Sequence, residues 1–168
     1  VGILHTDVKA LDIDAMAVST QKGLLGLYGM GFLYCKKESA EKITPAYLAR
    51  FGVDLGEGAH EAELGPSNYI LASGAKRFDL GNFNFAAAAA VYSSMGIILD
   101  LGTYKIEKYV VGLANVLSDS LIDLGLPVLR ANKDTEPGTL VSVGLLGEGQ
   151  HDSANDQNMT RLFNYLKD

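Results

Sequence analysis

The pattern of apolar and polar residues first predicts two short strands near the start of the chain. Residues 14–19 (DAMAVS) and 29–35 (GMGFLYC) carry apolar side chains on both faces, which is typical of buried strands. A glycine-rich turn that holds one lysine, Lys22, lies between them. Residues 1–13 show no sustained period, so we expect a connecting segment there.

Longer apolar stretches then predict two helices. Residues 85–101 are almost entirely apolar and include a run of alanines, so we expect a buried helix that ends at Gly102. Thr103 can cap a second helix, which Gly125 ends. The second helix carries one apolar stripe: Ile106, Val110, Leu113, Leu117, Leu121 and Leu124.

Shorter elements are expected around these helices. A short helix interrupted by Pro45 precedes a long, glycine-rich connection over residues 51–84. Strands are expected at residues 127–129 and 139–146, on either side of a turn at Pro137. A helix followed by two strands and a further helix indicates the start of a smaller α+β unit.

The last predicted helix and the chain ends indicate a piece of a longer polypeptide. Asn155 or Asp156 can cap this helix, and its apolar residues fall at helical spacing. The helix runs to Asp168 without a stop signal, and the chain starts at Val1 without an initiator methionine. We therefore expect an internal fragment.

Composition excludes several classes of protein. The chain has 168 residues, of which 48% are hydrophobic and 20% charged, as in an ordinary globular protein. Its net charge of -6 without long charged runs argues against nucleic-acid and anionic-membrane partners, and no apolar run has transmembrane length. A single cysteine, Cys35, excludes an internal disulfide and suits a reducing compartment, so a cytoplasmic protein is expected.

Lys22 is the first candidate for chemistry. A lysine in a turn between buried strands would lie near apolar surroundings, where burial disfavours the ammonium form and favours a nucleophilic amine. The alternative is a solvated loop lysine, which composition alone favours because most lysines are exposed.

The glycines around Lys22 match neither common phosphate-binding loop. A P-loop requires Gly-Lys followed by Ser or Thr, whereas Lys22 here precedes Gly23. The dinucleotide fingerprint fails because no third glycine follows Gly29 and Gly31 at the required spacing. The glycines still permit positive φ angles and close approach of the backbone to a neighbouring segment or ligand.

Two further sets of polar residues are candidates for binding a metal ion or an anion. His5 and Asp7 are too few for a metal site, and Leu64 stands where the H-E-x-x-H motif begun by His60 needs its second histidine, so no metal site is expected. Near the end of the long connection, Arg77, Asn82 and Asn84 could reach an anion. The alternative is a solvated arginine and turn-forming asparagines.

Two stretches resemble the class V aminotransferases, which are fold-type I pyridoxal-phosphate enzymes. The segment DIDAMAVSTQKGLLGLYGMGFLYCKK is similar to that family's aspartate-containing strand, its Ser-x-His-Lys, its glycine turn and its Gly-x-Gly strand. The segment RFDLGNFNF resembles the family's Arg-Phe-Glu-x-Gly-Thr-x-Asn. Isopenicillin N epimerase-like and cysteine desulfurase-like enzymes are the nearest branches in style, although Cys35 does not match the persulfide cysteine of the desulfurases.

The resemblance implies roles for five residues. Lys22 would be the Schiff-base lysine that holds pyridoxal 5'-phosphate. Ser19 and Gln21 would bind the cofactor phosphate, with Gln21 replacing the usual histidine. Gly81 and Asn82 would contact the same phosphate from the partner subunit, so a homodimer is implied.

The resemblance also implies a domain organisation. It gives an α/β fold in which residues 1–102 form the C-terminal part of the cofactor-binding large domain, a mixed sheet with helices. Residues 103–168 would start a smaller, incomplete α+β domain. The family's pyridine-pairing aspartate precedes the segment present here, and its substrate-binding arginine follows it, so the chain is expected to be inactive alone.

Two functions therefore stay open at the level of sequence. The first is a pyridoxal-phosphate enzyme that acts on an amino acid or amine through Lys22, by transamination, epimerisation or elimination. The second is a non-catalytic structural or interaction protein that retains the fold, which the loss of the histidine at Gln21 would favour.

Overall fold

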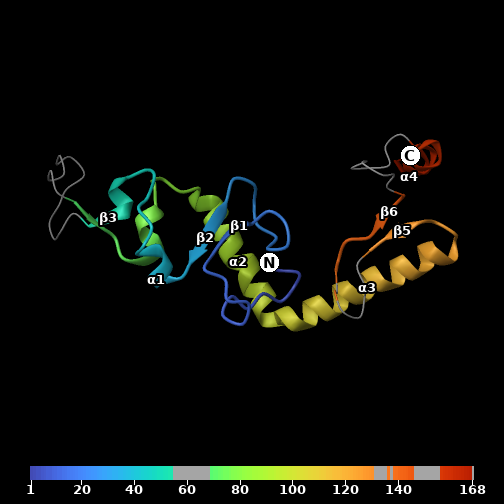
Figure 1. Cartoon of the computed structure of the whole chain (residues 1–168), viewed down its shortest axis with the longest axis horizontal. Helices are drawn as coiled ribbons and strands as arrows, with labels where there is room; N and C mark the ends of the chain where they lie inside the picture. Colours follow the sequence, from blue (N-terminus) through green and yellow to red (C-terminus); the bar gives the residue numbers. More distant parts are fainter. Residues whose placement is uncertain (55–68, 131–135, 137, 146–155, 168) are drawn as a thin grey trace. The chain divides into compact units, whose positions relative to one another are not determined.

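The computed structural model describes residues 1–54, 69–130, 136, 138–145 and 156–167 (Figure 1). The chain divides into two compact units, Val1–Thr103 and Tyr104–Asp168. That the units correspond to a cofactor-binding domain and the start of a small domain stays a prediction.

A strand pair opens the first unit. Strand β1 (Ala15–Ser19) pairs antiparallel with β2 (Gly31–Cys35), so that Ala15 lies opposite Cys35 and Ser19 opposite Gly31. Both predicted strands are confirmed, but the prediction that they are buried is wrong, since only Val18 among their residues is buried. The described residues form only a two-stranded sheet here, so most of its side chains lack a covering element.

Short elements follow the strand pair. They are α1 (Lys37–Ala40), the 3₁₀ helix η1 (Arg50–Gly52), β3 (Val53–Asp54), β4 (Ile70–Leu71) and the 3₁₀ helix η2 (Gly74–Phe78). The predicted short helix is confirmed as a single turn. His60 and Leu64, the residues that bear on the H-E-x-x-H motif, lie outside the described residues.

Helix α2 (Phe85–Leu101) has the predicted bounds because both of its ends are set locally. The Asn84 side chain caps the first turn, accepting a hydrogen bond from the Ala87 amide at 3.0 Å. Gly102 ends the helix with φ of 86°, which favours glycine. The expected burial of the whole helix is wrong: one stripe is buried, while residues on other faces such as Tyr92 are exposed. The buried stripe consists of Ala87, Val91, Ser94 and Ile98.

In the second unit, α3 (Thr103–Asp123) is followed by β5 (Val128–Leu129), β6 (Ser142–Val143) and α4 (Gln157–Lys167). Strands β5 and β6 pair antiparallel, which confirms two short strands after the helix. Asp156 caps α4 as predicted, accepting from the amides of Asn158 and Met159 at 2.8 and 3.0 Å. Asn155 and Pro137, also named in the predictions, lie outside the described residues.

Two predictions about α3 need correction. Thr103 is its first helical residue, and its hydroxyl pairs with His5 Nδ1 at 2.7 Å instead of capping the helix. The residues of α3 that are buried are Ala114 and Ser118, whereas Leu113 and Leu117 of the predicted stripe stay half exposed. Leu117, Leu121 and Leu124 line an apolar cavity together with residues of α4.

Within the described residues, no single helix is long and apolar enough to cross a membrane. Helices α2 and α3 pass that test only jointly, as a bent pair, on length and composition. The described part of the chain also holds no cluster of three or more His, Cys, Asp or Glu residues suited to a metal ion.

Candidate functional site

Lys22 lies in a short loop between β1 and β2, residues 20–26, which we call the lysine loop. Its carbonyl accepts a hydrogen bond from the Leu25 amide at 2.9 Å, and Leu25 has φ of 56°, unusual for leucine. The Lys22 side chain is exposed. The expected apolar surroundings of Lys22 are therefore wrong for the described residues, which leave its side chain uncovered.

Thr20 anchors the start of the lysine loop. It is completely buried, and both its amide and its hydroxyl donate to the Met30 carbonyl, at 3.2 and 2.9 Å. The Gly26 amide donates back to the Thr20 carbonyl at 2.8 Å. A Cβ at Gly26 would lie 2.8 Å from Thr20 Oγ1, so glycine is needed there for close packing. The predicted close approach of backbone at the glycines is confirmed at this position.

The N-terminal residues pack directly on the same loop. A Cβ at Gly23 would lie 2.5 Å from the Val1 carbonyl oxygen, and one at Gly2 would lie 2.3 Å from the Gly23 carbonyl oxygen. Two backbone segments therefore meet through two glycines immediately beside Lys22.

Helix α2 contacts the lysine loop from another side. Leu24 is 3% exposed, and Ser94 Oγ on α2 donates to its carbonyl at 2.6 Å. Ser94 is itself buried within the apolar stripe of α2. Sequence reasoning missed Ser94 and Thr20, and the only available signal for Ser94 was a polar residue at a stripe position of an apolar helix.

Ser19 and Gln21, the predicted phosphate contacts, lie together in the structure. The Ser19 hydroxyl donates to Gln21 Oε1 in a short hydrogen bond. Both residues line a shallow groove over the strand pair, together with Ala17, Val18, Gly29, Met30, Gly31, Phe32 and Leu33. The Gln21 amide nitrogen keeps its donors for a ligand, since Oε1 is the atom that accepts from Ser19.

Asn84 brings the start of α2 close to this groove. Its Oδ1 serves the helix cap, while Nδ2 lies 3.8 Å from where a Cβ would stand on Gly29. An amide donor and the N-terminus of a 17-residue helix therefore lie beside a residue of the groove wall.

The remaining predicted residues lie elsewhere. Gly81 has φ of 151°, and a Cβ on it would lie 3.9 Å from the Phe51 ring. Asn82 is exposed, and within the described residues it makes no hydrogen bond with Lys22, Ser19 or Gln21. A contribution of Asn82 from a partner subunit stays a prediction.

Arg77 is not an anion-binding residue in this structure. It is 8% exposed, and its guanidinium donates to the Ala72 carbonyl at 3.1 Å and to the Ala40 carbonyl at 3.0 Å. Both sequence interpretations, an anion ligand and a solvated arginine, are therefore wrong. Two of its donors instead tie the end of α1 to the residues before η2.

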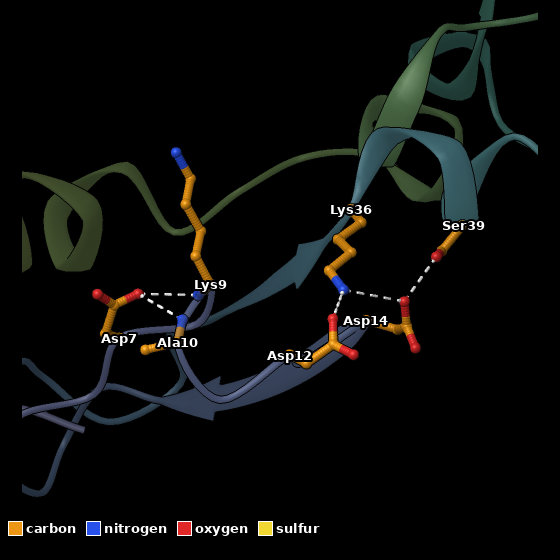
Figure 2. Close-up of polar contacts among 7 residues, drawn as sticks. All are labelled: Asp7, Lys9, Ala10, Asp12, Asp14, Lys36 and Ser39. Carbon is orange, nitrogen blue, oxygen red and sulfur yellow. Dashed lines mark hydrogen bonds and ion pairs between the residues drawn. The ribbon is translucent and has the colours of Figure 1, made fainter.

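Charged residues gather at the far end of the strand pair from the lysine loop (Figure 2). Lys36 Nζ lies 2.6 Å from an oxygen of Asp12 and 3.4 Å from one of Asp14, and Ser39 donates to Asp14 at 3.0 Å. The Ser39 hydrogen bond and the Lys36 charge lower the pKa of Asp14, and the hydrogen bond to Asp12 raises the pKa of Lys36. This network is exposed and joins the segment before β1 to the start of α1.

Asp7 makes a local turn that stands apart from that network. Its Oδ1 accepts from the amides of Lys9 and Ala10 at 2.9 and 3.1 Å, and these bonds lower the pKa of Asp7. The carboxylate stabilises the turn, and Asp7 is exposed, which confirms the expectation of a polar surface residue.

Comparison with known proteins gives one family. Residues 1–156 match the family model described as Aminotransferase class-V. The chain is 28% identical over 170 residues to the uncharacterized aminotransferase YcbU of Bacillus subtilis (strain 168), a match that covers 96% of the chain and 43% of that relative.

Solved structures show the same fold over part of their length. The apo structure of a cysteine desulfurase from Thermococcus onnurineus NA1 matches with a TM-score of 0.72 and 23% identity, covering 95% of this chain and 38% of that one. A mutant of C-DES with glycine covalently linked to its pyridoxal-phosphate cofactor matches with a TM-score of 0.68 and 20% identity, covering 96% and 40%. The mixed α/β prediction is confirmed over this partial region.

Proposed function

Because the chain belongs to the class-V aminotransferase family, we propose that it forms the lysine-bearing part of a pyridoxal-phosphate-dependent enzyme. The family resemblance predicted from the sequence is confirmed, and the family uses this cofactor. The chain spans less than half the length of its relatives, so the activity and substrate of the whole protein belong to this proposal.

The single observation that supports it most is the placement of Lys22. The side chain is exposed on a loop whose backbone is fixed by buried neighbours, and Ser19 and Gln21 lie within three residues of it along the chain. A fixed backbone with a free amine is what a covalent attachment site needs, because the nucleophile must be held while its atom stays accessible.

The residues present fit the phosphate of the cofactor. The groove beside Lys22 offers the Ser19 hydroxyl and the Gln21 amide, and Asn84 Nδ2 lies near its wall at Gly29. These neutral donors match phosphate oxygens, although a glutamine supplies less positive charge than a histidinium. The Ser19 hydroxyl would have to leave Gln21 Oε1 to serve a phosphate.

Within this proposal each residue has a distinct role. Lys22 Nζ would be the group that holds the cofactor, and its free amine would move the proton at the substrate's α carbon. Ser19 and Gln21 hold the phosphate. When bound, the cofactor supplies an electron sink that stabilises negative charge at the α carbon.

The substrate class is an amino acid or amine, and the fate of the proton distinguishes transamination, epimerisation and elimination. The groups that decide this outcome, and those that orient the substrate, are expected outside this chain. We therefore expect the chain alone to be inactive even where it takes up the cofactor.

The proposal is tested by mapping the cofactor attachment site. The full chain is incubated with pyridoxal 5'-phosphate, reduced with borohydride and digested for mass spectrometry. We expect the reduced phosphopyridoxyl group on Lys22, abolished in Lys22→Ala and retained in Lys76→Ala, which removes an exposed lysine elsewhere in the first unit. Equal labelling of Lys22, Lys76 and other exposed lysines would contradict a specific site.

The second candidate is a non-catalytic protein that retains the fold. The observation in its favour is the Ser19–Gln21 pair, in which two predicted phosphate ligands satisfy each other. In that case the chain would retain no visible absorption once excess cofactor is removed, and no lysine would be labelled preferentially.

A further inference from the structure

In the lysine loop, the backbone carbonyl of every second residue from Thr20 to Leu24 accepts a hydrogen bond, each from a different donor. The Thr20 carbonyl accepts from the Gly26 amide at 2.8 Å, and the Lys22 carbonyl accepts from the Leu25 amide at 2.9 Å. The Leu24 carbonyl accepts from Ser94 Oγ at 2.6 Å. The first two bonds close the lysine loop on itself, whereas the third reaches it from a helix seventy residues further along the chain.

The hydrogen bond from Ser94 is also placed where it can fix the backbone conformation of the lysine loop. Leu24 and Ser94 are both buried, so water cannot readily replace the hydroxyl as a donor to this carbonyl. Leu25, the next residue, adopts the left-handed conformation that leucine disfavours. A strained residue keeps such a conformation only where its surroundings hold it, and the Ser94 bond fixes the peptide group directly before it.

The other serine of α2 makes a different hydrogen bond. Ser93, the neighbouring serine, is exposed, and its hydroxyl donates to the Ala89 carbonyl of the same helix at 3.2 Å. Ser94 also lies 3.1 Å from the Val91 carbonyl, but its single proton can serve the shorter bond to Leu24. One of two adjacent serines therefore reaches the lysine loop.

We propose that Ser94 is a positioning residue for Lys22, which acts by fixing the Leu24 carbonyl and so the direction in which the lysine leaves its loop. This inference rests on the proposed role of Lys22 in holding the cofactor. A fixed loop speeds covalent attachment because the amine spends more time in a productive orientation.

The test compares Ser94→Ala with Ser93→Ala as the matched control. Hydrogen exchange of the Leu25 and Gly26 amides, followed by NMR on the full chain, reports opening of the lysine loop without any cofactor. We expect Ser94→Ala to speed their exchange about tenfold, the typical effect of losing one buried hydrogen bond. Exchange within the β1–β2 pair, such as at Tyr34, which lies in a hydrogen-bonded pair with Met16, should stay unchanged.

A second measurement connects the loop to the cofactor. The rate of borohydride-trapped phosphopyridoxyl labelling at Lys22 should fall several-fold in Ser94→Ala and stay normal in Ser93→Ala. Ser94→Thr keeps the hydroxyl and should restore both readouts. Ser94→Cys keeps the volume with only a weak donor and should behave like Ser94→Ala, which protects the test against a folding defect of the alanine variant.

The possible outcomes separate this inference from the proposed function. Unchanged loop exchange in Ser94→Ala, or faster exchange throughout the first unit, would overturn a positioning role. Faster loop exchange with an unchanged rate of Lys22 labelling would overturn it as well. Absence of label on Lys22 in the unsubstituted chain would instead remove the proposed function, while the exchange data would still report whether Ser94 braces the loop.

Discussion

Lys36 and its two aspartates show how single residues fix the approach to the strand pair. Lys36 follows β2, whereas Asp12 and Asp14 precede β1, so the ion pairs join the two chain segments at the same end of the sheet. The Lys36 amide also donates to the Asp14 carbonyl at 2.8 Å. Because these groups are exposed, their contribution depends on pH and on salt more than that of a buried pair.

At the residue scale this arrangement predicts how acid affects stability. The folded-state pKa of Asp14 is lowered from its ordinary value of 3.8, so its contribution is present above that value and is lost as pH falls through the lower folded pKa. We expect the melting temperature of the chain to fall below about pH 4, and to fall less steeply in Asp14→Asn. Thermal unfolding at low ionic strength between pH 2 and 6, taken as approximate limits, measures this difference.

Asp100→Asn is the matched control, because Asp100 is an exposed carboxylate that belongs to α2 and not to the segments joined by Lys36. It should leave the pH profile as it is. If the melting temperatures of Asp14→Asn and the unsubstituted chain change with pH in parallel, the Lys36 network does not contribute to acid sensitivity. Asp7, whose pKa is also lowered, should keep part of the acid sensitivity in every variant.

Single residues also show which parts of the candidate site can be predicted from the sequence and which cannot. The sequence identified Lys22, Ser19 and Gln21 through a motif, and the glycines through their ability to allow close backbone contact. It could not predict that Gly23 meets Val1 or that Ser94 bonds to Leu24, because such contacts depend on which distant segments fold together. Arg77 was misread for the same reason, since its carbonyl partners are set by tertiary packing.

At the scale of elements, α2 was predicted best in its bounds and less well in its burial. Asn84 and Gly102 are local signals for a helix start and stop, and they act within a few residues. Burial depends instead on what lies against each face. An almost uniformly apolar sequence does not reveal its buried stripe, because it has little difference between faces.

Asn84 permits a prediction that separates helix capping from ligand binding. Asn84→Ala removes the bond to the Ala87 amide and should destabilise the first unit by about 1 kcal/mol, the usual effect of losing an N-cap. Asn84→Asp keeps the cap but replaces the amide donor near Gly29 with a negative charge. Urea unfolding should therefore rank Asn84→Asp near the unsubstituted chain.

Cofactor affinity should rank these variants differently. If the groove beside Gly29 holds the phosphate, Asn84→Asp should weaken uptake of pyridoxal 5'-phosphate more than Asn84→Ala does, because like charges repel. Asn158→Ala, on α4 in the second unit, should change neither quantity. Equal affinity of Asn84→Asp and the unsubstituted chain would place the phosphate elsewhere.

At the scale of the whole molecule, the open question is how the two predicted parts of the phosphate site meet. Lys22, Ser19 and Gln21 occur in and beside one loop, but Asn82 makes no hydrogen bond with them within the described residues. The strand pair also keeps apolar side chains such as Leu33 exposed. Sequence could suggest a homodimer only through the family resemblance, because an interface between copies leaves no signal in the periodicity of one chain.

A complementation experiment tests whether Asn82 acts across a dimer. Lys22→Ala and Asn82→Ala chains are unfolded, mixed in equal amounts and refolded, and cofactor labelling is measured at a pyridoxal-phosphate concentration too low to load Asn82→Ala alone. If Asn82 acts on the cofactor site of the partner chain, one site of each mixed dimer combines the intact Lys22 of one chain with the intact Asn82 of the other. Random pairing into two-fold dimers should therefore restore about a quarter of the sites. Recovery of no labelled sites, with dimers present by size-exclusion chromatography, would mean that Asn82 acts within its own chain, because neither variant chain then contains a complete set of residues. Loading of Asn82→Ala alone at the same cofactor concentration as the unsubstituted chain would mean that Asn82 has no role.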